Sequence, residues 1–170
     1  MGDRTARWRN YEHFSWTSRT RLEDLARDET PWNDYLATTV YLENARLKGC
    51  VQPTTDGGGD HPPMGPLHII TAIQPEADPQ SDESSARLQI LQRYLATARK
   101  ASIRAVGSSL DGTYREESCA VFGLDDNRAR KIGRKFGQVA IFAWRGPRWS
   151  LIACAAEKQT HMAWKWQPAP

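Results

Sequence analysis

The sequence lacks most of the features that assign a protein to a class at first sight. It has only three cysteines, Cys50, Cys119 and Cys154, which lie far apart and form no C-x-x-C pair. This scattered set argues against a disulfide framework and a structural zinc site, and it favours a reducing compartment, so we expect the cytoplasm. No apolar run approaches the roughly 20 residues that a membrane-spanning helix needs, and the first residues carry no apolar signal-peptide core.

Catalytic signatures are missing as well. The chain has no G-x-S-x-G, no phosphate-binding loop and no H-E-x-x-H motif, and its four histidines are dispersed. Asp56, Asp60 and His61 are the obvious candidates for metal ligands, but they stand in a glycine-rich segment where solvated loop acids are common. We therefore expect no metal, and no motif identifies a cofactor.

The totals describe an ordinary soluble chain. It has 170 residues, a mean hydropathy of −0.66 and 39% hydrophobic residues, enough for one domain with a real core. With 23 basic and 20 acidic residues, its net charge of +3 does not by itself indicate nucleic acid, and it shows nothing that would place the protein in a membrane.

The most apolar run, residues 67–75 (LHIITAIQP), organises the rest of the sequence. Both of its alternating faces are mostly apolar, and it ends abruptly at Gln74-Pro75. A strand with two apolar faces is usually covered on both sides. We therefore expect these residues to form the central strand of the sheet.

Periodicity and capping residues predict the other elements around this strand. We expect an irregular arm over 1–16, a helix over 18–28, a strand over 32–42 and a loop over 48–66. After the central strand we expect helices over 81–99 and 125–136, and strands over 102–108, 117–123, 138–144 and 148–155. A Trp/Pro-rich tail over 157–170 completes the chain, so that residues 17–156 form a single domain.

This order predicts the α+β class and a ferredoxin-like fold, the split β-α-β arrangement of an antiparallel sheet with two helices on one face. An N-terminal helix and strand and a C-terminal strand extend it. Right-handed crossovers place the central strand between the strands that start at Ser118 and Gln138. Its second face then needs a cover from the N-terminal helix, the tail or a second subunit, so a homodimer is one expected partner.

The same topology brings polar residues from distant segments to one end of the sheet, where the central strand stops. The candidate ligand-binding residues at this rim are Thr71, Gln74, Ser85, Glu116, Ser118 and Gln138. Uncharged and acidic side chains that converge from several segments suit a small polar ligand. The structural alternative is that they satisfy loose backbone groups at strand ends.

Several short motifs recur in the order seen in a known family. They are Ile69-Ile70-Thr71-Ala72 with Pro75, Glu116-Glu117-Ser118, Lys135-Phe136-Gly137-Gln138, and the Tyr35, Thr38 and Tyr41 set. Over roughly residues 33–145 the chain resembles the bacterial domain-of-unknown-function family 3293. The family pattern Ile-Thr-Ala-x-Asn-Pro has Gln74 in place of its Asn here, and Ser84-Ser85 stand where the family has an Asn at the helix start. The resemblance implies positions but no chemistry.

We therefore expect an uncharacterised binding or regulatory module whose site is the polar rim. One alternative is an RNA-binding protein that uses the basic helix over 125–136 and the aromatic and basic arm. The balanced charge disfavours it, and rings of the arm that dock on the domain surface explain the arm equally well. The other alternative is an enzyme with Glu116 as general base and Ser118 or Cys119 as nucleophile, although no third residue completes a triad.

Overall fold

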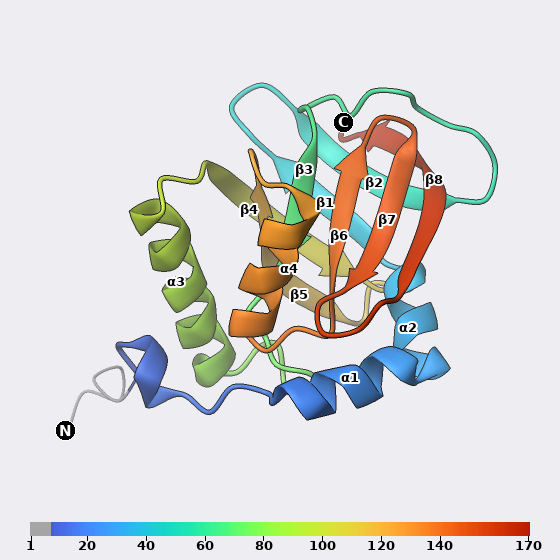
Figure 1. Ribbon diagram of the computed structural model, residues 1–170. Helices are drawn as coiled ribbons and strands as arrows, with labels where there is room; N and C mark the ends of the chain where they lie inside the picture. Colours follow the sequence, from blue (N-terminus) through green and yellow to red (C-terminus); the bar gives the residue numbers. More distant parts are fainter. Residues whose placement is uncertain (1–7) are drawn as a thin grey trace.

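A computed structural model describes residues 8–170, which form a closed antiparallel β-barrel with helices on its outside (Figure 1). The strands are β1 (Thr39–Glu43), β2 (Lys48–Thr54), β3 (Leu67–Ile70), β4 (Ser102–Ser108), β5 (Arg115–Val121), β6 (Ala140–Arg145), β7 (Arg148–Ala153) and β8 (Gln159–Pro168). The helices are a 3-10 turn (Tyr11–His13), α1 (Arg19–Arg27), α2 (Glu29–Leu36), α3 (Asp82–Thr97) and α4 (Asp126–Lys135). Around the barrel the order is β1-β2-β8-β7-β6-β3-β5-β4, and β4 pairs with β1.

The predicted place of the central strand is confirmed, but the predicted open ferredoxin-like sheet is wrong. β3 lies between β5 and β6, as the crossover rule requires. The predicted sheet consists of β4, β5, β3 and β6, in that order, with β4 and β6 at its edges. These two edges are not free, because β4 pairs with β1 and β6 pairs with β7. β2 and β8 then join the two sides. Closure removes the unpaired strand edges that an open sheet would expose.

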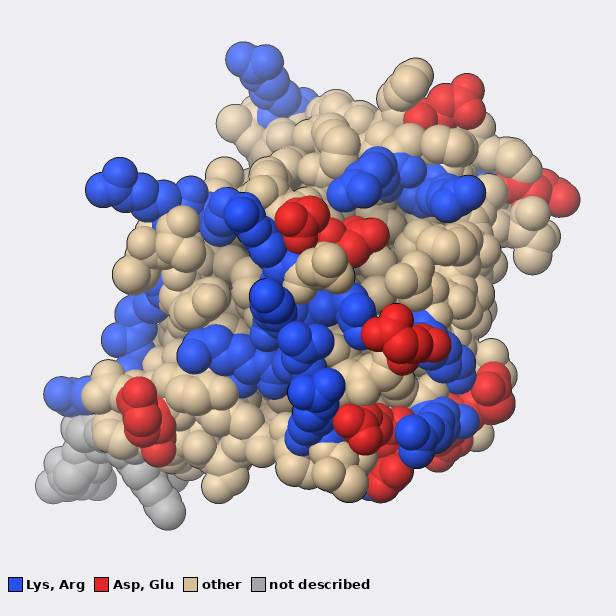
Figure 2. Space-filling model, viewed as in Figure 1, with Lys and Arg blue, Asp and Glu red and all other residues tan. Residues whose placement is uncertain are grey.

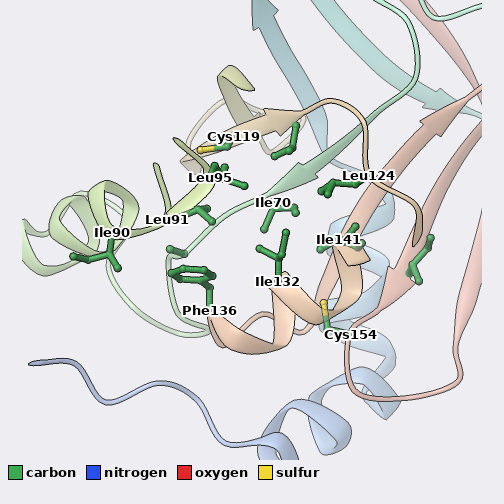
Figure 3. Packing of buried hydrophobic residues seen from close by; sticks show 14 of the residues in the cluster. Ile70, Ile90, Leu91, Leu95, Cys119, Leu124, Ile132, Phe136, Ile141 and Cys154 are labelled. Carbon is green, nitrogen blue, oxygen red and sulfur yellow. The ribbon is translucent and has the colours of Figure 1, made fainter. Parts of the chain in front are cut away.

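One layer of core lies outside the barrel, under α3 and α4 (Figure 3). Leu91 and Leu95 of α3 and Ile132 and Phe136 of α4 pack on outward-facing residues of the sheet such as Ile70. These helical residues recur at the spacing of one helix face, which is why both helices were predictable. The packing fixes α3 and α4 on the side of the barrel formed by β3, β5 and β6.

The other face of β3 points into the barrel, and tryptophans fill this interior at one end. Trp144 lies edge-on to Trp149 and Trp164, with ring centroids 5.9 and 4.9 Å away. All three are buried, together with Leu67 and Ile69 of β3. The chain therefore covers the second face of the central strand with its own strands.

The strand predicted over 32–42 is helical in its first part. Asp28 caps α2 by accepting a hydrogen bond from the Thr30 amide at 3.0 Å, and β1 begins only at Thr39. Pro31, which suggested the end of a helix, lies in the first turn of α2. A proline there costs no hydrogen bond, because the first amides of a helix have no partner within it.

Two strands of the barrel were not predicted. β2 lies in the segment expected to be a loop, and β8 lies in the segment expected to be a tail. Gly49 and Pro53 disguised β2, but the pairing of β2 with β8 explains the glycine. A Cβ at position 49 would lie 2.5 Å from the carbonyl oxygen of Gln167 in β8, so only glycine fits this pairing.

The described part of the N-terminal arm docks on the domain. The rings of Tyr11 and Trp16 stack at 4.9 Å, and both meet Phe136 of α4 edge-on. The Tyr11 hydroxyl donates to the carbonyl of Lys135. Residues 1–7 of the predicted arm lie outside the described residues. Among residues 8–170, no helix is long and apolar enough to cross a membrane.

Candidate functional site

The barrel holds a cavity of about 650 Å³ at the strand ends away from the tryptophans. Part of its wall is apolar and comes from inward-facing residues of the strands, among them Val40, Ile69, Phe142 and Leu151. α2 lies over this end of the barrel (Figure 1) and contributes Tyr35, while the turn between β4 and β5 forms another side of the mouth. The volume is in the range of pockets that hold small organic molecules.

Five of the six predicted rim residues line this cavity, and one does not. Thr71, Gln74, Glu116, Ser118 and Gln138 come together there from three segments of the chain. Ser85 is exposed on α3 and takes no part in the cavity lining. The topological argument for convergence therefore holds locally, because β3, β5 and β6 pair as expected even though the sheet closes.

The amide of Gln74 serves the fold. Its Oε1 accepts from the amide and the hydroxyl of Thr17, both at 2.8 Å. Its Nε2 donates to the carbonyls of Ala72 and Phe136 at 2.9 and 2.8 Å. The amide group thus ties the N-terminal segment to the end of α4. Gln74 therefore fits the alternative interpretation of the rim, in which polar side chains bond to backbone groups at strand ends and not to a ligand.

Gln138 and Thr71 also donate side-chain hydrogen bonds to backbone carbonyls of the fold. The Gln138 Nε2 donates to the carbonyls of Ile73 and Phe136 at 3.0 and 2.9 Å, which leaves its Oε1 without a partner among residues 8–170. The Thr71 hydroxyl donates to the Glu117 carbonyl at 2.8 Å. Both side chains therefore have structural roles, and Gln138 also keeps a free acceptor.

Glu116 is the residue of the cavity with the most unusual electrostatics. It lines the cavity and is half-buried. Burial raises the pKa of its carboxyl group to about 7, although the Tyr114 hydroxyl, which donates to Oε2 at 2.7 Å, lowers it in part. The pKa of Tyr35 and of Tyr114 is raised too, first by burial and then by the nearby Glu116 charge.

The structure places no activated nucleophile beside Glu116. The Ser118 hydroxyl is 5% exposed, and its one contact with a described residue is the Glu116 backbone carbonyl at 3.5 Å. Cys119 points to the opposite side, into the cluster under the helices, where burial raises the pKa of its thiol to about 12. Neither side chain has a base within hydrogen-bond distance, so nucleophilic catalysis lacks its second partner.

Sequence reasoning missed Tyr35 and Tyr114 as cavity residues. Tyr35 was assigned to a strand although it belongs to α2. Tyr114 was assigned to no element, although it stands two positions before Glu116. Side chains at i and i+2 share one face of a strand, so this spacing could have linked Tyr114 to the site.

Of the five basic residues of α4, Arg128, Lys131 and Lys135 are exposed, and Arg130 and Arg134 are partly buried. Figure 2 shows lysines and arginines gathered on the side of the molecule where α4 lies, with acidic residues among them. Arg130 donates to the carbonyls of Ala153 and Ala156, and Arg134 donates to that of Cys154. These arginines hold the turn between β7 and β8.

Two polar pairs outside the cavity have structural explanations. His68 Nε2 lies 2.8 Å from Asp126 Oδ1 at the start of α4, and burial lowers the pKa of this histidine. Ser150 Oγ lies 2.6 Å from His161 Nδ1, but these residues are register partners on β7 and β8. Among residues 8–170 no group of three or more His, Cys, Asp or Glu side chains could hold a metal ion.

The part of the chain that supplies most of the polar lining also carries the family resemblance. Residues 70–141 match the family DUF3293, proteins of unknown function. This confirms the resemblance over a shorter range than the sequence suggested, since Tyr35, Thr38 and Tyr41 fall outside it. The DUF3293 segment runs from the end of β3 into β6 and includes all six of the predicted rim residues. No curated protein and no solved structure matches this chain.

Proposed function

We propose that this protein binds a small organic molecule inside the barrel cavity, and that it acts as a binding or regulatory module. The observation that supports this is a cavity of about 650 Å³ with apolar walls and a few polar groups that protein partners leave free. Cores are normally packed without voids of this size. A hollow lined by a half-buried carboxyl group, Glu116, and a buried hydroxyl, Ser118, suits a ligand better than it suits a core.

The side chains at the mouth of the cavity also support this proposal. Leu110 at the tip of the β4–β5 turn is 79% exposed, and Tyr114 beside it is 46% exposed. Both belong to the cavity lining. Exposed apolar side chains at the edge of a concave site gain free energy when a ligand or a closing segment covers them.

Graded filling of the cavity tests the proposal. Gly107 lies on β4 in the cavity wall, and a Cβ there would contact the Thr38 methyl at an ordinary 3.5 Å. We expect small-molecule fragments that bind the protein to shift the methyl NMR signals of Ile69 and Leu151. Their affinity should fall through the series Gly107→Ala, Gly107→Val and Gly107→Phe, by about tenfold or more for Phe.

The smallest substitution is the internal control, because one methyl group should leave both binding and folding nearly unchanged. Binding that persists in Gly107→Phe would place the fragments elsewhere and contradict the proposal. The same conclusion would follow if no fragment in the set moved either methyl signal.

A second candidate is an enzyme that uses Glu116 as a general acid or base. A carboxyl group with a pKa near 7 is suited to proton transfer at neutral pH. If substrate turnover is found, Glu116→Gln should abolish it while fragments still bind the cavity. Turnover that survives this substitution would remove Glu116 from the chemistry.

A further inference from the structure

The charges that line the cavity are all of one sign. Four carboxylates line it: Glu116 on β5, Asp34 on α2, Glu76 after β3 and Asp111 in the β4–β5 turn. No lysine, arginine or histidine is part of the described lining, although the whole chain carries more basic than acidic residues. The field inside the cavity therefore repels anions and attracts cations.

Three of these carboxylates have no positive partner among residues 8–170. Glu76 forms a salt bridge with Arg21 at 3.1 Å, and Asp111 is held by the hydroxyls of Ser109 and Thr113. Glu116 and Asp34 form no salt bridge with any residue of 8–170. Glu116 is the deeper of the two, and its Oε1 has no hydrogen-bond partner in that range. A buried carboxylate left in this state is costly unless a cation joins it.

The hydrogen-bonding groups of the lining show the same bias. Most side-chain donors are already bonded to the protein; among them are Thr38, Thr71, Gln74, Ser108, Tyr114 and Gln138. In the described part of the chain, the hydroxyl of Tyr35 forms no hydrogen bond, and the hydroxyl of Ser118 forms only a long one of 3.5 Å to the Glu116 carbonyl. The acceptors, by contrast, remain free on Glu116 and on Gln138, which is 5% exposed. The cavity thus offers acceptors to a ligand that brings donors.

Aromatic rings complete the lining. Tyr35, Tyr114 and Phe142 all line the cavity. Ring faces attract organic cations, and the attraction grows when water is excluded.

We propose that the ligand of this cavity is an organic cation with N–H donors, an amine or guanidine protonated at neutral pH, and that Glu116 is its counter-ion. This inference rests on the proposed binding function. A protonated amine would place its N–H groups toward Glu116 and Gln138 and its carbon skeleton against Ile69, Phe142 and Leu151.

The test uses three compounds of similar shape and different charge: 2-phenylethylamine, 2-phenylethanol and phenylacetate. Binding is followed through the Ile69 and Leu151 methyl signals. We expect the amine to bind at least about tenfold more tightly than the alcohol, the value of one charge-assisted hydrogen bond, and the acid more weakly still.

The pH dependence gives an independent readout. The other ionisable groups that line the cavity with Glu116 are Tyr114, Tyr35, Asp34, Glu76 and Asp111, none of them a cation. A cation is held by the ionised carboxylate, so its affinity should rise as the pH passes upward through about 7. A neutral or anionic ligand held by the protonated carboxyl group would show the opposite trend.

Two matched variants test whether Glu116 is the group that favours the amine over the alcohol. Glu116→Gln should lower amine affinity at least about tenfold and leave the alcohol unchanged. Glu117→Gln should change neither, because Glu117 lies on the outer face of the same strand, paired with Arg104. Equal or tighter binding of the alcohol or the acid in the cavity would overturn the cation inference while the binding function stands. If none of the three compounds shifts either methyl signal, both the inference and the binding function are overturned.

Discussion

Glu116 should make the ligand-free protein less stable at neutral and alkaline pH than a variant with an uncharged side chain at this position. In the folded protein its pKa is raised from the usual 4.5 to about 7. As the pH rises from 4.5, the unfolded chain loses this proton first, while the folded protein keeps it. The contribution of this group to folding is therefore present at low pH and is lost as the pH rises through about 7.

The size of the effect follows from the two pKa values. A difference of about 2.5 pH units at about 1.36 kcal/mol each gives an upper limit of about 3 kcal/mol. Water that enters the cavity reduces this figure. Glu116→Gln has no proton to lose and keeps an oxygen that can accept from Tyr114. We therefore expect it to match the wild type at pH 4 and to be about 1–3 kcal/mol more stable at pH 8.

Urea denaturation followed by tryptophan fluorescence measures this difference. The informative quantity is the free energy of unfolding of the variant minus that of the wild type, plotted from pH 4 to pH 9, because other titrating groups cancel in it. Glu117→Gln, on the outer face of β5, should give a nearly flat curve within about 0.5 kcal/mol. A flat curve for Glu116→Gln, or a variant less stable than the wild type at pH 8, would refute the burial of an unpaired carboxyl group.

Two further predictions test the fold around the site. Gln74→Ala should lower the free energy of unfolding by about 2–4 kcal/mol, because it removes four hydrogen bonds from a buried amide, and it should leave fragment affinity unchanged. Thermal unfolding equal to that of the wild type would contradict the structural role of Gln74 and favour a role in ligand binding. Deletion of residues 157–170 should abolish cooperative unfolding in circular dichroism, because β8 pairs with both β2 and β7; a stable, cooperative shortened protein would show that the barrel does not need this strand.

Local signals were enough to predict the part of the fold around β3. The caps Ser18, Ser81 and Asp125 each accept a hydrogen bond from an amide in the first turn of their helix. The alternation of apolar residues and the crossover rule then gave the neighbours of β3. The convergence of Gln74, Glu116, Ser118 and Gln138 followed from this local topology and did not depend on whether the sheet closed.

The closure of the barrel was not predictable in the same way, because the pairing of β2 with β8 joins segments about a hundred residues apart. Nothing local to either strand specifies the other. One signal was nevertheless present in β8. Met162, Trp164 and Trp166 alternate with His161 and Lys165, the period-2 pattern of a strand with one buried face. The high proportion of polar residues in this segment concealed it.

The inward-facing residues of the strands explain why one end of the barrel is hollow. On β6 the inward residues grow from Ala140 through Phe142 to Trp144, from the cavity end to the filled end. On β5 they change from Glu116 and Ser118 at the cavity to apolar Ala120 beyond it. A chain that fills one end of its barrel with tryptophan could fill the other in the same way. Small and acidic residues at every second position are therefore what we expect of a site that keeps room for a ligand, and they are the basis for the proposal that Glu116 is its counter-ion.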